Sequence, residues 1–328
     1  MKNPVRVAIS GAAGRIANNL LFSIASGQLL GDQQPILLSL LEMPARLPML
    51  NGIAMELHDG VFPLLAGVEV SDDPWRAFEG VDYVFLISSP LDSLATASKT
   101  ADARMEQHGN TFAIHGRALN EAAGRGVKVL VISNPVMINA LMVQRNAPDL
   151  DPSCISALMR LDHNRAHALL AHKAGAHLAD VRKVIVWGNH SATQYPDFHH
   201  ATIGGVRADT LLDNDWLHQI SVGIIRQRGY AVIDAYGGLR AASSAAKAAI
   251  DHMRDWIFGT RDGDWTSMGI LSDGSYGIPS GVFFGFPVVS HQGQVNIVRE
   301  LKLSSERLKK IHRSADEIYQ RCRQFNLL

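Results

Sequence analysis

Residues 5–17 read VRVAISGAAGRIA, and this stretch decides the fold. Val5 to Ser10 form a short apolar run rich in β-branched residues, which is typical of a buried parallel strand. A glycine turn follows, and from about Arg15 apolar side chains recur at helical spacing as far as Gly27. The stretch therefore predicts a buried strand, a tight turn and a helix.

The same alternation continues through the first half of the chain. Further buried strands are expected at 36–41, 83–88 and 127–133, with helical stretches between them. Strands that alternate with helices predict a parallel sheet with helices on both faces. This is an α/β fold of the doubly wound kind.

The pattern changes after about residue 150, so a second lobe is expected there. We place the boundary near Ala147-Pro148-Asp149, giving domains 1–150 and 151–328. The second lobe should be a mixed α+β unit, with these elements: a strand at 181–187, an alanine-rich helix at 241–258, an antiparallel hairpin at 282–298 that turns near Gln292-Gly293, and an amphipathic helix from Ser304.

Composition excludes several classes of protein. The chain has 328 residues, of which 47% are apolar and 19% charged, so it can bury a core and is not disordered. Its 31 basic and 31 acidic residues give no net charge that would attract nucleic acid or an anionic membrane. Two cysteines are too few for a disulfide framework, and no run of 18 apolar residues occurs. We expect a soluble, cytoplasmic protein with free thiols.

The glycine turn at residues 11–14 lies where a dinucleotide-binding loop belongs. Gly11 permits the tight turn, and Gly14 lets the backbone approach a pyrophosphate. Arg15 and Ile16 open the helix, whose N-terminus offers free N–H groups and a partial positive charge. A glycine turn between strand and helix can also be purely geometric.

Glu42 adds a second sign of a dinucleotide site, because it directly follows the second strand. A carboxylate there can accept both hydroxyls of an adenosine ribose and repels a 2′-phosphate. Loop, spacing and acid together predict NAD rather than NADP as the cofactor. The alternative is a solvated charge at the end of a strand.

Three residues are the candidates for catalysis of hydride transfer. His190 ends an apolar strand, and histidine is suited to exchange a hydroxyl proton at neutral pH. Asp162 can fix its tautomer and stabilise the imidazolium. Arg165, three residues further along the same helix face, can bind a substrate carboxylate through two parallel hydrogen bonds. Each also has a structural alternative: a hydrogen-bonded histidine, a helix N-cap and a surface ion pair.

Several long motifs in a fixed order resemble the lactate/malate dehydrogenase family, and within it the NAD-dependent malate dehydrogenases of the cytosolic type. The motifs that carry the resemblance are Gly11-Ala12-Ala13-Gly14, Leu40-Leu41-Glu42, Met55-Glu56-Leu57, Gly116-Arg117-Ala118-Leu119-Asn120-Glu121, Asn134-Pro135, Leu161-Asp162-His163-Asn164-Arg165, Trp187-Gly188-Asn189-His190-Ser191 and Tyr276-Gly277-Ile278-Pro279.

The resemblance implies a Rossmann lobe, a mixed second lobe and a homodimer formed through helices. It further implies that His190 is the acid/base, Asp162 its partner, Arg165 the carboxylate clamp and Asn134 a polar contact near the nicotinamide and the substrate. The partner would be a small 2-oxo or 2-hydroxy acid, with neither nucleic acid nor membrane bound.

The chain departs from the family in residues 88–104, where the family's mobile loop supplies two arginines. One grips a distal carboxylate and the other polarises the reacting carbonyl, and neither has a clear counterpart here. Lys99 or Arg104 can stand in for them, or both can be solvated loop charges. Arg240 occupies a position where the family has a small residue facing the substrate. We hypothesise that the pocket is rebuilt for a different anionic or polar group; the alternative is that Arg240 turns outward.

Two other readings of the chain stay open. It can be a non-catalytic NAD-binding member of the family whose loop has decayed, although the pair His190 and Asp162 argues against decay. A metal enzyme is suggested only by His199 and His200, whose spacing matches no familiar zinc pattern, so we predict no metal site.

Overall fold

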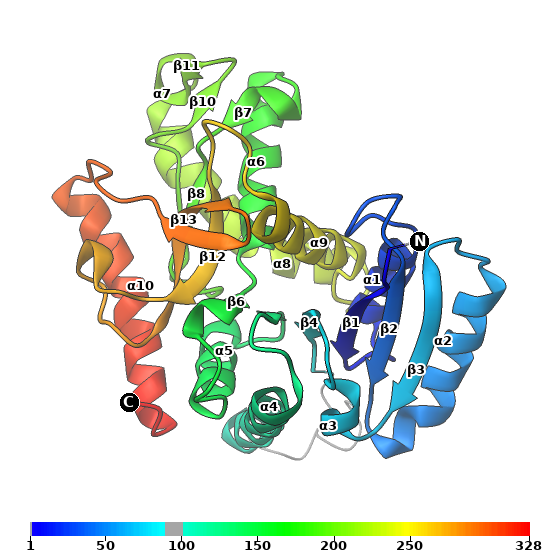
Figure 1. Cartoon of the computed structure of the whole chain (residues 1–328). Coiled ribbons are helices and arrows are strands. Elements are labelled where there is room, and N and C mark those ends of the chain that lie inside the picture. Colours follow the sequence, from blue (N-terminus) through cyan, green and yellow to red (C-terminus); the bar gives the residue numbers. More distant parts are fainter. Residues whose placement is uncertain (1, 89–100) are drawn as a thin grey trace. The chain divides into compact units, whose positions relative to one another are not determined.

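The computed structural model describes residues 2–88 and 101–328, without the side chains of residues 101–109, 218, 220 and 221. The chain divides into two compact units between Ser156 and Ala157. Each unit is described separately below, and Figure 1 shows the course of the chain through both.

The first unit is built on a parallel sheet in the order β5-β4-β1-β2-β3. Its strands are β1 (Val5–Ser10), β2 (Ile36–Leu41), β3 (Leu65–Ser71), β4 (Tyr83–Leu86) and β5 (Lys128–Val131). The strand order reverses between β1 and β4, and ligands bind at such a point in open α/β sheets. This arrangement confirms the predicted doubly wound parallel sheet.

Helices connect these strands. They are α1 (Arg15–Ala25), α2 (Leu47–Asp59), α3 (Pro74–Ala77), α4 (Ala101–Ala122) and α5 (Val136–Arg145), with short turns of 3₁₀ helix at η1 (Pro44–Arg46) and η2 (Pro152–Cys154). The predicted helix from Arg15 is α1, and its apolar stripe is fully buried, from Ala17 to Ala25. The strand β6 (Ile155–Ala157) contains the division between the units.

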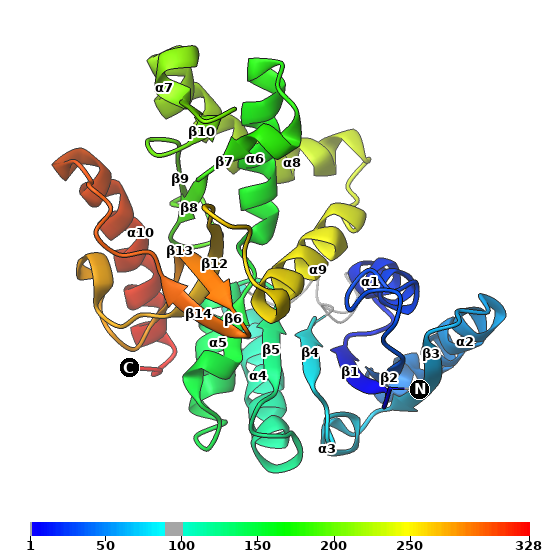
Figure 2. The ribbon, with the colours of Figure 1, turned by 45° about the horizontal axis from the view of Figure 1, so that its top comes forward.

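The second unit is mixed, as expected for the C-terminal lobe. Three of its antiparallel strands pair in the order β14-β13-β12: β12 (Thr266–Leu271), β13 (Phe283–His291) and β14 (Gln294–Ile297). A two-stranded sheet contains β8 (Ile185–Trp187) and β9 (Tyr195–Asp197). A three-stranded sheet contains β7 (Val181–Arg182), β10 (Thr202–Ile203) and β11 (Val206–Arg207). Its helices are α6 (Arg160–Ala174), α7 (Ala208–Leu211), α8 (Ser221–Ala235), α9 (Ser243–Phe258) and α10 (Ser305–Gln324), with short helical turns at η3 (Leu178–Asp180), η4 (Trp216–Ile220) and η5 (Ser275–Gly277). Figure 2 shows α6, α9 and α10 around these strands.

Most expected elements are present, one expectation needs correction, and one strand was not expected. The hairpin β13–β14 turns at Gln292-Gly293 and α10 follows its N-cap Ser304, as predicted. The single strand expected at 181–187 is wrong, because Lys183 adopts a left-handed φ of 59° and separates β7 from β8. The strand β3 was not predicted, since its residues are only partly buried and lack a continuous apolar run.

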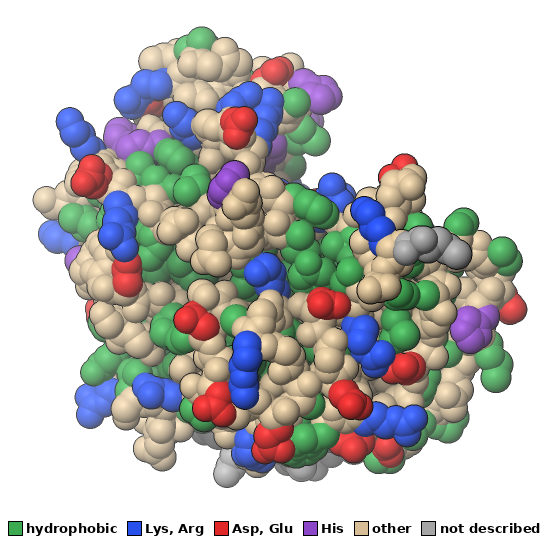
Figure 3. Space-filling model, viewed as in Figure 1, with side chains coloured by type: hydrophobic (Ala, Val, Ile, Leu, Met, Phe, Trp, Pro, Cys, Tyr) green, Lys and Arg blue, Asp and Glu red, His purple; other side chains and the backbone are tan. Residues whose placement is uncertain are grey.

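The surface carries both signs of charge. On the face shown in Figure 3, lysines and arginines are interspersed with acidic residues. Among the described residues, no helix is both long and apolar enough to cross a membrane. Cys154 and Cys322 are both free and buried.

Candidate active site

The glycine turn of the first unit has the geometry that a pyrophosphate-binding loop needs. Gly11 directly follows β1 and adopts a φ of 60°, which glycine tolerates without a steric cost. Gly14 is the N-cap of α1, and no side chain caps this end of the helix. Arg15 is exposed and Ile16 partly exposed in the first turn. The N-terminal end of α1, with its partial positive charge, can therefore receive an anion.

Glu42 lies at the carboxyl end of β2, beside the same turn. It is only 5% exposed, and its carboxylate accepts hydrogen bonds from the backbone N–H of Ala13 and of Met43, both at 3.1 Å. Arg46 lies 3.8 Å from the carboxylate and donates to the carbonyl of Ala13. Each carboxylate oxygen keeps a lone pair beyond these bonds, so Glu42 can also accept hydrogen bonds from the two hydroxyls of a ribose. Sequence reasoning did not include Arg46.

Asn134 follows β5, at the same carboxyl edge of the parallel sheet as Gly11 and Glu42. Its side chain is exposed, and the peptide bond to Pro135 is cis. Three of the predicted residues thus come from the carboxyl ends of β1, β2 and β5, which is the ligand-binding edge of such a sheet.

The second unit brings the three predicted catalytic residues into contact. Asp162 lies in the first turn of α6 and is completely buried. One carboxylate oxygen contacts Nδ1 of His190, and the other accepts a hydrogen bond from Nη1 of Arg165 at 3.0 Å. The N-cap of α6 is Met159, so Asp162 is not the N-cap that was its structural alternative. His190 enters this contact from the turn that follows β8.

Charge, more than burial, sets the protonation of the pair. The negative charge of Asp162 raises the pKa of His190, against the opposing effects of burial and of Arg165. Burial by itself would raise the pKa of Asp162, but His190 and Arg165 outweigh it and the pKa lies below its usual value. The pair therefore favours an imidazolium beside a carboxylate.

Both polar partners of Asp162 keep groups that can meet a substrate. His190 uses Nδ1 for the carboxylate, so Nε2 has no partner among the described residues, and 22% of its side chain is exposed. Arg165 is 15% exposed and uses only Nη1 within the described part of the chain. The arrangement can donate a proton from Nε2 and bind a carboxylate through the remaining guanidinium N–H groups.

The other candidate cations are not part of this cluster or have side chains outside the described part of the chain. Arg240 is exposed in the connection between α8 and α9. Lys99 lies outside the described residues, and for Arg104 the structure gives only its place in α4. Within the described ranges, no cluster of His, Cys, Asp or Glu could hold a metal ion.

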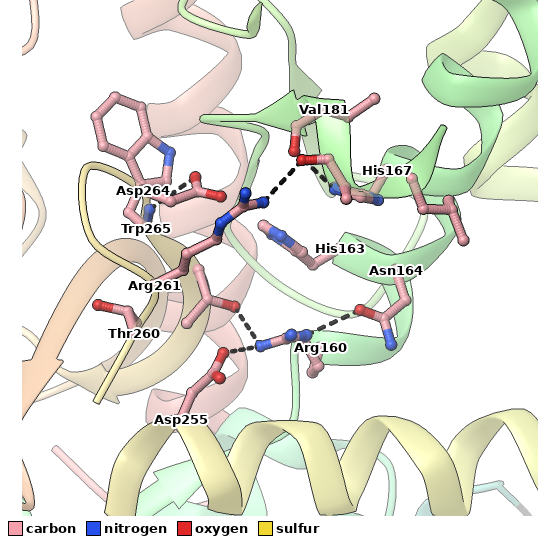
Figure 4. A pocket seen from close by; sticks show the side chains of 13 residues that line it. Arg160, His163, Asn164, His167, Val181, Asp255, Thr260, Arg261, Asp264 and Trp265 are labelled. Atoms are coloured by element: carbon pink, nitrogen blue, oxygen red, sulfur yellow. Dashed lines mark hydrogen bonds and ion pairs between the residues drawn. The ribbon is translucent and has the colours of Figure 1, made fainter. Parts of the chain in front are cut away.

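A cavity of about 320 Å³ opens on another stripe of α6, and neither Asp162, Arg165 nor His190 lines it. Figure 4 shows Arg160 at its floor, bound to Asp255 and Asn164. The buried ring of His163 lies above Arg160, and its Nδ1 contacts Ser267. The predicted site and this cavity are therefore separate.

Sequence reasoning also missed Ser314 and Glu317 of α10, which bind the turn that carries His190. One signal was available. Ser314 is a polar residue on the otherwise apolar stripe of α10, between Ile311 and Ile318, and it is completely buried.

Comparisons with known proteins identify the family of this chain. The family description "lactate/malate dehydrogenase, NAD binding domain" matches residues 5–155, and "lactate/malate dehydrogenase, alpha/beta C-terminal domain" matches residues 159–325. The chain belongs to the lactate/malate dehydrogenase family. It is an NAD-dependent 2-hydroxy acid dehydrogenase, and its first unit is the NAD-binding domain of that family.

Solved structures of this family superpose over nearly the whole chain. Malate dehydrogenase from Naegleria fowleri is 39% identical, with 100% of both chains covered and a TM-score of 0.93. Lactate dehydrogenase from Trichomonas vaginalis, solved in complex with NADH and oxamate, is 34% identical, with 96% of each chain covered and a TM-score of 0.90. Lactate dehydrogenase from Eimeria maxima is 19% identical, covers 99% of this chain and 97% of its own, and shares the fold with a TM-score of 0.82.

Proposed function

We propose that this family member reduces the keto group of a 2-oxo acid with NADH and oxidises the corresponding 2-hydroxy acid in the reverse direction. The observation that carries the proposal is the position of Asp162, whose two oxygens contact His190 and Arg165. One residue thereby couples the proton donor to the cation that would bind the substrate carboxylate.

The chemistry divides between these residues. When bound, NADH would supply the hydride that the carbonyl carbon receives. His190 donates the proton on Nε2 to the carbonyl oxygen, and Asp162 stabilises the protonated ring that precedes this step. Arg165 holds the carboxylate through its free N–H groups and so fixes the position of the carbonyl. Hydride and proton together convert the ketone to an alcohol.

The protonation state of His190 determines whether the enzyme favours reduction or oxidation at a given pH. Reduction needs the imidazolium, and the raised pKa of His190 keeps more of it protonated near neutral pH. Oxidation needs the neutral ring. Reduction should therefore fall, and oxidation rise, as pH increases through the pKa of His190.

The far end of the substrate is, we propose, bound by Arg240. Residues 88–104 contain a single arginine, Arg104, so Arg240 is a candidate to supply a guanidinium for a distal anionic or polar group. Arg240 is exposed and precedes α9, which packs against α6, the helix of Asp162 and Arg165. Its guanidinium can bind such a group by charge-assisted hydrogen bonds.

A panel of 2-oxo acids that differ only in the distal group tests this proposal. NADH oxidation is measured with pyruvate, 2-oxobutyrate, oxaloacetate and 2-oxoglutarate, and NADH binding is measured separately by fluorescence. We expect turnover of at least one acid, with the preferred acid carrying a distal polar or anionic group. NADH binding without turnover of any acid would favour the non-catalytic member of the family instead.

Arg240→Ala then tests the distal contact. The variant should raise the KM of the preferred acid about 10- to 150-fold, since a charge-assisted hydrogen bond contributes about 1.5 to 3 kcal/mol. NADH affinity should stay unchanged. Unaltered kinetics for every acid in the panel would show that Arg240 does not bind the substrate.

A further inference from the structure

The turn that carries His190 is bound to the C-terminal helix α10 on both sides of the histidine. Before it, the backbone N–H of Asn189 donates to Oγ of Ser314 at 2.9 Å. After it, the hydroxyl of Ser191 donates to the carboxylate of Glu317 at 2.7 Å. Helix α10 therefore fixes the backbone on either side of the proposed proton donor.

The contact is close enough to exclude any side chain at the start of the turn. Gly188 has a φ of 92°, and a Cβ built there would lie 2.2 Å from Oγ of Ser314. Gly188 also exchanges two backbone hydrogen bonds with Gly285 of β13, at 3.1 and 3.0 Å. The turn is consequently packed between a strand and α10, with only a glycine able to fit.

Thr193 completes the connection and fixes the direction of its hydrogen bonds. Its Oγ1 lies 3.1 Å from Oγ of Ser314 and also contacts the carboxylate of Glu317. An ionised carboxylate only accepts hydrogen bonds, so Thr193 and Ser191 both donate to Glu317. Oγ1 of Thr193 is then left to accept from Ser314. Oγ of Ser191, which lies 2.9 Å from Oγ1 of Thr193, accepts from the N–H of Thr193 at 3.1 Å. The polar groups form a single directed network that ends at Glu317.

We infer that Ser314 and Glu317 are positioning residues for catalysis, which hold the turn 188–193 so that His190 contacts Asp162 and directs Nε2 toward the substrate. Neither residue touches the reacting atoms. The inference rests on the proposed function, because His190 acts there as the proton donor.

This positioning has a physical reason. Asp162 holds the ring of His190 through a single hydrogen bond, and 22% of the side chain remains exposed. Without α10, the anchors of the turn that remain among the described residues lie at its ends: the pairing of β8 with β9, the pairing of Gly188 with Gly285, and Arg226, whose Nε donates to the carbonyl of Gln194 at 2.7 Å. A misplacement of about 1 Å in a reacting group can lower a rate about 100-fold.

Variants of α10 test the inference with two independent measurements. Ser314→Ala and Glu317→Ala should each lower kcat for the preferred 2-oxo acid about 10- to 100-fold while leaving NADH affinity unchanged. Glu317→Gln keeps an oxygen that accepts the same two hydrogen bonds, so it should stay within about threefold of the wild type. The exposed neighbour Asp316 supplies the control, because Asp316→Ala removes a charge from the same helix without touching the turn.

The second measurement does not depend on turnover. The ring of His190 is titrated by NMR, with its signal assigned by loss in His190→Gln. The charged groups that act on this ring are Asp162 and Arg165. If the turn moves away from Asp162, the pKa of His190 should fall toward its ordinary value in Ser314→Ala and Glu317→Ala, but not in Asp316→Ala. A loss of stability alone would not move it.

The outcomes separate the two proposals. A wild-type protein that turns over none of the acids contradicts the proposed function, while the NMR titration still tests the positioning. An active wild type whose kcat and His190 pKa are the same in Ser314→Ala and Glu317→Ala overturns the inference. If Ser314→Ala fails to fold, the comparison of Glu317→Ala with Glu317→Gln decides alone.

Discussion

One histidine lies at each of two faces of α6, and the two have opposite pKa shifts. His190 contacts Asp162 on one face, and this carboxylate raises its pKa. His163 faces the cavity of Figure 4, where burial, reinforced by the positive charges of Arg160 and His167, lowers its pKa well below the ordinary value. Burial without a carboxylate therefore lowers the pKa and favours the neutral ring of His163. The buried carboxylate of Asp162 raises the pKa and favours the protonated ring of His190.

The largest effect in this comparison should come from removing the charge of Asp162. Asp162→Asn keeps the size of the side chain but removes the negative charge that stabilises the imidazolium and selects its tautomer. We expect kcat for reduction to fall about 10,000-fold, as when the buried acid of a catalytic triad is replaced by its amide. The pKa of His190 should fall at the same time, so that residual reduction moves to lower pH. Steady-state rates between pH 5 and 9 measure both.

The other face of α6 supplies the control. Asp255→Asn removes a carboxylate that pairs with Arg160 beside the cavity. This change should leave the pH profile of reduction in place, since Asp255 does not contact His190. A shift as large as that of Asp162→Asn would mean that charge anywhere around α6 sets the protonation of His190, and the contrast between the two faces would be lost.

The next effect concerns the two arginines of α6, one on each face. Arg165→Lys retains a positive charge but loses the planar pair of N–H donors that matches a carboxylate. We expect KM for the 2-oxo acid to rise about 10- to 150-fold, with NADH affinity unchanged. Arg160→Lys, which alters the cavity face, should leave KM within about threefold of the wild type. Equal effects of the two substitutions would argue against Arg165 as the carboxylate clamp.

Local patterns were enough to predict most of the first unit, without β3, and part of the site. The run Val5–Ser10 and the helix from Arg15 both begin at the predicted residues, because a buried strand and an apolar helical stripe leave clear periodicities. The spacing of Asp162 and Arg165 also placed them on one helix face, where the structure joins them by a hydrogen bond.

What the sequence concealed depends on the backbone or on distant contacts. Lys183 adopts the left-handed conformation that divides the strand expected at 181–187. Because the residue is not a glycine, the sequence does not indicate this conformation. The bonds from Asn189 and Ser191 to α10 join residues more than 120 positions apart. No local periodicity reports such a contact, so Ser314 could be noticed only as a polar residue on an apolar stripe.

The smallest expected effect is on how stability changes with pH. The sign of this change is opposite for His190 and His163. His190 has a raised pKa, so its pairing stabilises the fold fully below the unfolded pKa of about 6.5 and is lost as pH rises through the folded pKa. His163 has a lowered pKa, so the unfolded chain takes up a proton more readily once pH falls below about 6.5. Burial of His163 therefore costs stability in acid.

Urea unfolding at pH 7 and pH 5 measures this contrast. In the wild type, buried His163 lowers the free energy of unfolding by up to about 1.4 kcal/mol per pH unit below pH 6.5. His163→Gln has no such group, so the variant should lose less stability than the wild type on acidification. His190→Gln removes a pairing that strengthens in acid, so it should lose more. The difference in the free energy of unfolding between the two pH values is compared within each variant, which cancels the cost of the substitution itself. A matching pH dependence for both variants would mean that Asp162 does not distinguish the two faces of α6.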